Sequence, residues 1–198
     1  MATETRAQFL DAAEALFAER GFYGVSIAAI ADELGLTKQA LLHHFGSKEK
    51  IYAAVLERIS GRFEGLIPEA QSEGEPPALQ LKQFFLKLHQ MSQNSPLQTQ
   101  LLMRELLDNK HRAPGAARWY LKPFLEKLIA MLQAIPRWRT VTEADAFAVL
   151  YQLLGSITYY AVSKTTLVGI FGQDGFAEKD AVFESRLSDL IDRALDCP

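Results

Sequence analysis

A run of twenty residues, positions 26–45, constrains the fold of this chain more than any other feature. It reads SIAAIADELGLTKQALLHHF and holds two short helical patterns on either side of Gly35. Ser26 and Thr37 each precede one pattern, where a hydroxyl can accept a hydrogen bond from the free amides of the first helical turn. Glycine adopts the positive φ that a tight turn after a helix requires. The run therefore predicts two short helices joined by a tight turn.

The remainder of the chain also reads as helix, because no alternating, β-branched segment bounded by turns is found. An apolar face formed by Phe9, Ala13, Leu16 and Phe17 predicts a first helix that ends at Gly21. A loop is expected at Gly169, Gly172, Asp174 and Gly175, and a kink or break at Pro123. The predicted fold class is all-α with about nine helices, over approximately residues 5–20, 27–34, 38–43, 48–67, 78–93, 96–108, 116–134, from 142 through 162, and 178–195.

Two short capped helices around a glycine turn are the helix-turn-helix pattern, whose second helix lies in the major groove of DNA. In the second helix Leu41 and Phe45 are expected to turn inward. The opposite face is then polar, with Lys38, Gln39, His43 and His44. The free amides that follow Thr37 can face a phosphate. The pattern predicts a DNA-reading surface on residues 37–45.

The charge distribution supports this location. The formal net charge is −3, and residues 1–50 hold five basic and seven acidic side chains. Between Thr37 and Lys50, however, three lysines face the single carboxylate of Glu49, and two histidines are added. DNA affinity is expected to come from this short patch and from its duplication in a dimer.

Residues around the two helices resemble the TetR family of transcriptional regulators. The resemblance covers about residues 5–56, and beyond residue 60 only the all-helical layout matches. It rests on Ala12-Ala13, Leu16-Phe17, Gly21-Phe22, Val25-Ser26, Ile30-Ala31, Gly35-Leu36-Thr37, Leu41 and Phe45 through Lys48. It implies a helix-turn-helix DNA-binding domain at residues 1–46, and a helical regulatory, ligand-binding and dimerisation domain at residues 47–198.

The resemblance also implies roles for single residues. Thr37, Lys38, Gln39 and Ala40 would lie at the DNA end of the recognition helix, Lys48 would contact a phosphate, and His44 would lie near the DNA backbone. Leu42 departs from the family, in which many members carry a tyrosine that can bond a phosphate. We expect that contact to be absent or replaced by His43.

Each of these residues has a simpler interpretation. Gln39 can read adenine through a bidentate hydrogen bond, or it can be an ordinary solvent-facing helix residue. The adjacent His43 and His44 do not point in one direction on a helix, so no metal site is predicted. Cys197 is the single cysteine of the chain. No cofactor is expected.

The second half of the chain is rich in aromatic and sulfur-containing side chains, most of which are expected to form the core. The family layout implies a pocket among its helices, and polar side chains there could orient a small, mostly apolar effector. The candidate ligand-binding residues are Phe85, His89, Met103, Arg104, Trp119, Tyr120, Gln152 and Ser156. The resemblance further implies that the last two helices pair with those of a second copy. The candidate dimer residues are Leu153, Tyr160, Phe183, Leu187, Leu190 and Ile191.

Catalytic motifs are not found, because the chain lacks a nucleophile elbow, a phosphate-binding glycine loop and a zinc-binding His-Glu-x-x-His. No signal peptide is seen, and no apolar run approaches the ~18 residues of a membrane span. The sequence therefore predicts a cytoplasmic, homodimeric regulator, a repressor released from a palindromic operator by its ligand, with no membrane partner. The alternative is an architectural DNA-binding protein of the same fold that has no ligand.

Overall fold

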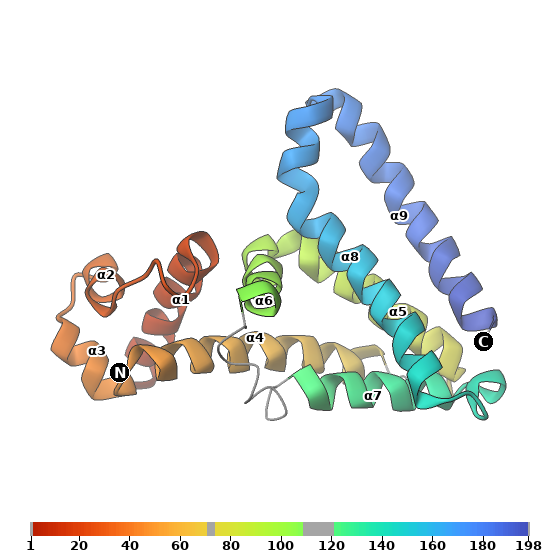
Figure 1. Cartoon of the computed structure of the whole chain (residues 1–198), viewed down its shortest axis with the longest axis horizontal. Coiled ribbons are helices and arrows are strands. Elements are labelled where there is room, and N and C mark those ends of the chain that lie inside the picture. The colour runs from red at the N-terminus through yellow and green to blue at the C-terminus, as the bar shows by residue number, and fades with distance from the viewer. Residues whose placement is uncertain (1, 71–73, 109–120, 198) are drawn as a thin grey trace. The chain divides into compact units, whose positions relative to one another are not determined.

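The computed structural model describes residues 2–70, 74–108 and 121–197, and every regular element in them is helical (Figure 1). The predicted all-α fold class is confirmed for these residues. The helices are α1 (Ala2–Arg20), α2 (Ile27–Glu33), α3 (Lys38–Phe45), α4 (Lys48–Ala70), α5 (Pro77–Asn94), α6 (Pro96–Asp108), α7 (Leu121–Gln133), the 3-10 turn η3 (Pro136–Trp138), α8 (Glu143–Phe171) and α9 (Gln173–Asp196).

The helices form two compact units. In the part of the chain that is described, the first unit holds α1, α2, α3, the segment of α4 as far as Arg62, and α6 from Leu97. The second unit holds α4 from Phe63, α5, α7, η3, α8 and α9. Helix α6 thus belongs to the same compact unit as the N-terminal helices, which the sequence pattern does not indicate. The functional division between residues 46 and 47 stays a prediction.

The core of the first unit is built on the apolar face predicted for α1. Phe9, Ala13 and Phe17 are fully buried, and Leu16 is nearly so. Ile30 and Leu41 complete this core from α2 and α3. The rings of Phe17 and Tyr52 meet edge to face with their centroids 4.9 Å apart. This preferred aromatic geometry adds to burial in holding α1 against α4.

In the second unit, α5 packs against α7, α8 and α9. Its apolar side chains Leu81, Phe84 and Phe85 are fully buried. The indole of Trp138 in η3 is also buried, and its Nε1 donates a hydrogen bond of 2.9 Å to the carbonyl oxygen of Leu195. This bond satisfies the polar atom of a buried indole and ties the short turn after α7 to the end of α9.

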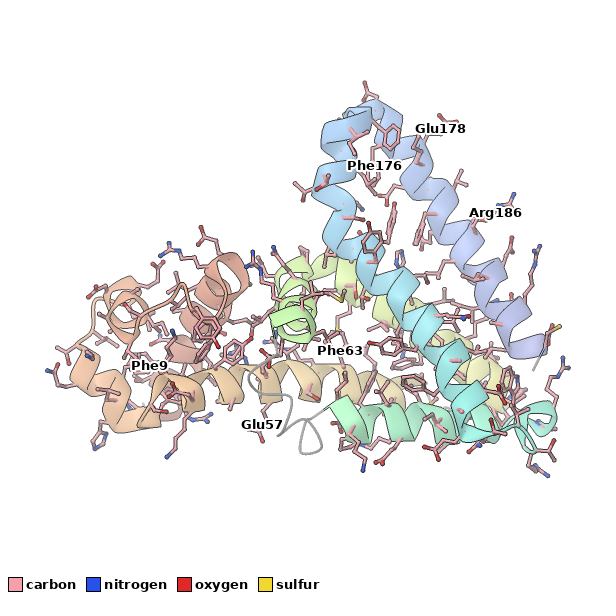
Figure 2. The ribbon with its side chains drawn as sticks, viewed as in Figure 1. Phe9, Glu57, Phe63, Phe176, Glu178 and Arg186 are labelled. Carbon is pink, nitrogen blue, oxygen red and sulfur yellow. The ribbon has the colours of Figure 1, made fainter. Side chains whose placement is uncertain are left out.

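The loop predicted around Gly169, Gly172, Asp174 and Gly175 is wrong. Helix α8 continues to Phe171, α9 begins at Gln173, and Gly172 alone lies between them. Gly172 has φ +74 and ψ 164, a backbone region that is essentially restricted to glycine. Phe176, labelled in Figure 2, is buried near the junction and stacks with Tyr160 at 6.3 Å. The glycines at this junction favour a loop, whereas the burial of Phe176 favours a helix, and the helix forms.

Two prolines also differ from expectation. Helix α4 does not stop before Pro68 but continues to Ala70, so this proline lies in its last turn. Pro123, expected inside a helix over 116–134, lies in the first turn of α7. A first-turn residue needs no intrahelical N–H bond, so proline is tolerated there without a kink. The predicted start of this helix near residue 116 lies outside the described residues.

Helix α8 is long and apolar enough to cross a membrane by length and composition alone. The expectation that no segment approaches this limit is therefore wrong, because few charged residues interrupt its 29 residues. The helix packs against α5, α7 and α9 within the second unit. Central helices of helical bundles meet the same length and composition criterion, so this property is weak evidence for a membrane.

The backbone at Gly172 yields a stability prediction. Gly172→Ala should destabilise the protein by about 1–3 kcal/mol, because alanine must adopt a conformation restricted to glycine. Gly65→Ala is the matched control: Gly65 lies within α4, and a Cβ added there meets nothing within 4 Å. It should stabilise the protein by about 0.5–1 kcal/mol. Urea unfolding of both variants measures the two effects, and equal stability would contradict the strain at Gly172.

Candidate nucleic-acid interface

The turn between α2 and α3 is fixed by hydrogen bonds of its own backbone. The amide of Leu36 bonds the carbonyl of Ala31 at 2.9 Å, and the amide of Gly35 bonds Asp32 at 3.0 Å. This pair of bonds around a glycine with φ +64 is the Schellman arrangement that ends many helices. The turn predicted at Gly35 is therefore present, and it sets the direction in which α3 leaves α2.

Both predicted N-caps are confirmed. The Ser26 hydroxyl accepts a hydrogen bond from the amide of Ala29 at 3.0 Å. The Thr37 hydroxyl accepts from the amide of Ala40 at 3.2 Å. Two short helices thus begin at defined residues, with their first-turn amides partly satisfied and the rest available to an acceptor.

Helix α3 has one buried and one exposed face. Leu41 and Phe45 are buried, as predicted. The side chains that face solvent are Thr37, Lys38, Gln39, His43 and His44, while Ala40 and Leu42 are half-buried. The structure therefore brings six of the seven proposed DNA-contacting residues together on one short helix and its cap. What they contact stays a prediction.

Lys48, the seventh of these residues, is half-buried at the start of α4. Its ammonium lies 4.4 Å from the centroid of the Phe22 ring, a cation–π geometry. The ring restrains the lysine but leaves its N–H groups for other acceptors, so a phosphate contact remains compatible with this position.

Two further cations of this unit were not among the seven residues predicted to contact DNA. Lys50 is exposed, and its Nζ would lie 3.7 Å from a Cβ added at Gly46, the C-cap of α3. Arg6 is exposed on α1, with its guanidinium 5.2 Å from the centroid of the Phe45 ring. Lys50 follows from the local charge count, whereas only the packing of α1 on α3 reveals Arg6.

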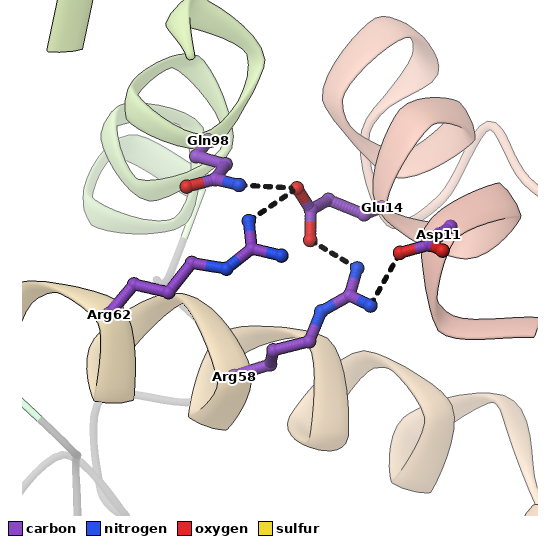
Figure 3. Close-up of polar contacts among 5 residues, drawn as sticks. All are labelled: Asp11, Glu14, Arg58, Arg62 and Gln98. Carbon is purple, nitrogen blue, oxygen red and sulfur yellow. Dashed lines mark hydrogen bonds and ion pairs between the residues drawn. The ribbon is translucent and has the colours of Figure 1, made fainter. Parts of the chain in front are cut away.

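Beside this surface, α1, α4 and α6 meet at the carboxylate of Glu14 (Figure 3). Arg58 of α4 donates one hydrogen bond to Glu14 and a second, of 2.6 Å, to Asp11. Gln98 of α6 donates to Glu14 at 2.9 Å, and Arg62 pairs with it at 3.6 Å. Glu14 is largely buried while Asp11 is exposed. The Glu14 cluster, defined as these five residues, thus holds three helices of the first unit.

The candidate ligand-binding residues do not all come together. Phe85 and His89 are buried one turn apart on α5, in the second unit. Met103 and Arg104 are half-buried on α6, in the first unit, where the Arg104 guanidinium lies beside Gly21. Trp119 and Tyr120 lie outside the described residues.

The two candidate ligand-binding residues of α8 point elsewhere. Gln152 is exposed to solvent, so in the single chain it does not line an interior site. Ser156 is half-buried, and its hydroxyl donates a hydrogen bond of 2.9 Å to the carbonyl of Leu153 in its own helix. In the sequence this helix has apolar residues on nearly all its sides, so the pattern does not show which side faces the core.

The structure reveals a polar cluster that the sequence did not. Lys164 of α8 pairs with Asp180 of α9 at 2.7 Å, and the Tyr160 hydroxyl donates to the same carboxylate at 2.6 Å. Burial raises the pKa of Asp180, but the bonds from Lys164 and Tyr160 outweigh it and the net pKa is lowered. Burial, followed by the bond to Asp180, raises the pKa of the Tyr160 phenol well above its usual range. His89 lies beside this group, and burial lowers its pKa.

Most of the candidate dimer residues are buried or half-buried within the chain, and one is exposed. Leu153, Leu187 and Ile191 are buried within the chain, so they serve its own core and are not available to a second copy. Tyr160 is also buried and stacks on the half-buried Phe183 with ring centroids 3.5 Å apart. Among the candidates Leu190 is exposed. The exposed large apolar side chains of α8 and α9 are Phe147, Tyr151, Tyr159, Ile170, Phe171, Val182 and Leu190.

The family described as "Bacterial regulatory proteins, tetR family" matches residues 9–55. The HTH-type transcriptional regulator RutR of Escherichia coli is 26% identical over 153 residues, covering 77% of this chain and 71% of RutR. The family match thus covers the N-terminal helices of the chain. The HTH-type transcriptional regulator TtgR of Pseudomonas putida is 36% identical over 74 residues, or 37% of this chain. The chain matches about a third of TtgR, since the aligned part covers 35% of it.

A solved structure extends the likeness over the whole fold. A TetR-like transcriptional regulator from Rhodococcus sp. RHA1 has a TM-score of 0.68 and 23% identity, over 97% of this chain and 96% of the other. At this identity the likeness establishes the fold alone. The TetR family match lies on α1, α2, α3 and the start of α4, which are the helices that carry the exposed polar face described above.

His89 yields a pH prediction. Its pKa is lowered in the folded protein by burial, with the carboxylates of Glu184 and Asp180 opposing this effect and Lys164 adding to it. The unfolded chain therefore binds a proton more readily, and stability should fall as the pH drops below about 6.5, the usual value for histidine. The carboxyl of Asp180 titrates at lower pH, since its pKa is lowered from 3.8.

Urea unfolding between about pH 7 and pH 5 tests this prediction. In His89→Phe the loss of stability over this range should shrink, because the ring that must be protonated is gone. His43→Asn removes an exposed histidine instead and serves as the control. If both variants keep the wild-type slope, His89 is not the titrating group.

Proposed function

We propose that this chain is a TetR-family regulator that binds DNA sequence-specifically, active in the cytoplasm as a homodimer without a catalytic role. The observation that carries the proposal is the exposed polar face of α3, on a helix whose cap, turn and buried face are all defined. Short recognition helices of this kind place their N-terminal residues at base edges in the major groove.

Each contact in the proposed complex follows from the chemistry of one side chain. Gln39 can pair with adenine through two hydrogen bonds. Lys38, Lys48 and Lys50 can neutralise phosphates, and this contribution does not depend on sequence. A two-fold axis between two copies would present two such helices, and a palindromic operator matches that symmetry.

The dimer seam that we propose lies on the exposed apolar side chains of α8 and α9. Tyr159 is 69% exposed, Val182 54% and Leu190 47% in the single chain. Exposed apolar surface is typical of interaction sites. This seam replaces the buried residues Leu153, Leu187 and Ile191 expected from the sequence.

We further propose that the second unit binds a small effector that releases the protein from DNA, which makes the regulator a repressor. The polar cluster around Lys164 and Asp180 lies beside His89, whose ring contacts the ring of Phe183, and it supports a ligand site with both polar and apolar walls. The alternative is an architectural DNA-binding protein without an effector. Selection of bound DNA from a random pool tests the proposal: a palindromic consensus supports a regulator, and unselected binding supports the alternative.

Substitutions on the recognition surface separate base readout from phosphate contact. Gln39→Ala should relax the preference at one base pair in each half-site, at a cost of about 1–3 kcal/mol. Lys48→Ala should weaken binding to all sequences equally and reduce the salt slope by about one for each phosphate that is no longer neutralised. Fluorescence anisotropy with operator and scrambled DNA at several salt concentrations gives both quantities. If DNA selected by Gln39→Ala shows the same consensus as DNA selected by the wild type, Gln39 does not read a base.

The seam is tested by charge placed on exposed and on buried positions of α9. Leu190→Glu should give folded monomers that bind operator weakly, because a dimer would bury an unpaired charge. Leu187→Glu, at a buried position, should instead lower the stability of the chain itself. Sedimentation and circular dichroism distinguish the two results. A stable dimer of Leu190→Glu with normal operator affinity would place the seam elsewhere.

A further inference from the structure

Three buried polar atoms on one face of α5 have no hydrogen-bond partner among the described residues. They are Nδ1 of His89, Oγ of Ser92 and Nε2 of Gln93. Residues spaced three and four apart lie on one side of a helix. Ser92 is 1% exposed and His89 7% exposed, so bulk water does not solvate them. Buried polar atoms without a partner are costly and are rare in folded proteins.

Apolar rings surround this face. Phe85 precedes His89 by one helical turn and is fully buried. The His89 ring lies 5.7 Å from the ring of Phe183 and 6.3 Å from that of Tyr160, measured between centroids. An apolar wall with a few polar groups is the composition of small-molecule sites.

The amide of Gln93 is oriented by a charged neighbour. Lys164 donates to its Oε1 at 2.8 Å, which turns the Nε2 donors away from the ammonium. The same ammonium pairs with Asp180 at 2.7 Å. The face therefore offers an oriented N–H donor beside a lysine whose charge is already neutralised.

We propose that this face of α5, around His89, Ser92 and Gln93, binds a small neutral molecule that carries a carbonyl or amide oxygen on an apolar body. The oxygen accepts from Gln93 Nε2, while the hydroxyl of Ser92 and the imidazole of His89 can each donate or accept. A carboxylate fits less well, because it would compete with Asp180 for the ammonium of Lys164. The proposal rests on the effector response proposed above, but binding itself is measured without DNA.

Small probes that differ in charge test the assignment. Benzamide and cyclohexanecarboxamide are compared with benzoate and cyclohexanecarboxylate at millimolar concentration, by NMR of the full-length protein. The two amides should shift the side-chain amide signals of Gln93 and the ring signals of His89, with affinity about tenfold above that of the matched carboxylates. Tighter binding of the carboxylates would overturn the neutral assignment. If none of the four probes moves these signals, the polar atoms bond a buried water and the site is refuted.

Variants identify the polar atoms that bind. Ser92→Ala and Gln93→Leu should each weaken binding of the amides about tenfold. If Gln93→Leu does not fold, Ser92→Ala still tests the site, because it changes the side chain less. Thr99→Val is the matched control, because Thr99 also has a buried hydroxyl without a described partner but lies on α6 in the first unit. Unchanged amide affinity in folded Ser92→Ala and Gln93→Leu would overturn the site. Operator binding by the same samples reports on the proposed function separately, since loss of one does not entail loss of the other.

Discussion

The packing of the first unit depends on the hydrogen bonds and ion pairs that the carboxylate of Glu14 receives. A largely buried charge is tolerated only when it is paired and hydrogen-bonded, and Glu14 receives Arg58, Arg62 and Gln98 from two other helices. A buried bond from Tyr52 to Glu105, at 2.7 Å, joins α4 to α6 a second time. The helix-turn-helix therefore rests on α1, and α1 is held to α4 and α6 by bonds that need all three helices in place. A displacement of α6 would break several of these bonds together.

Under the proposed effector response, α6 is the helix through which these bonds would respond to a ligand. An effector can shift the equilibrium between two states only by binding them differently. The bonds from Gln98 to Glu14 and from Tyr52 to Glu105 would supply a discrete difference of that kind, because α6 would either keep these partners on α1 and α4 or separate from them. Typical couplings between sites are about 1–3 kcal/mol, and a single hydrogen bond to a charged group contributes about 1.5–3 kcal/mol. A large rearrangement is not needed to account for a response of this size.

The parts of the fold that the sequence predicted are those determined locally. Ser26, Gly35 and Thr37 fix the ends of α2 and α3 within a few residues, so caps and turns are readable from the chain. The junction at Gly172 was not, because burial of Phe176 of α9, whose ring stacks with that of Tyr160 of α8, favours helix despite the glycines around it. The pair of Glu14 and Gln98 spans 84 residues, and no local pattern signals such a contact.

The same distinction holds for the candidate sites. The face of α3 was predicted because helical periodicity separates Leu41 and Phe45 from the polar side chains. Helix α8 is apolar on most sides, so periodicity could not tell the buried Leu153 from the exposed Tyr159. His89 was predicted as a polar side chain among apolar ones. Its neighbours Lys164 and Asp180 come from other helices, and only the packed structure brings them together.

The charge of the chain argues that the proposed DNA affinity needs two copies. Each recognition surface carries few cations, and the protein as a whole has a net charge of −3. Electrostatic affinity grows with the number of phosphates neutralised, so one α3 with its neighbouring lysines would bind weakly at physiological salt. Pairing through α8 and α9 would double these contacts on one DNA molecule and raise the effective concentration of the second helix. Under this proposal, the exposed apolar side chains of α8 and α9 and the few lysines near α3 would serve one requirement, because DNA binding would be strong only in the dimer.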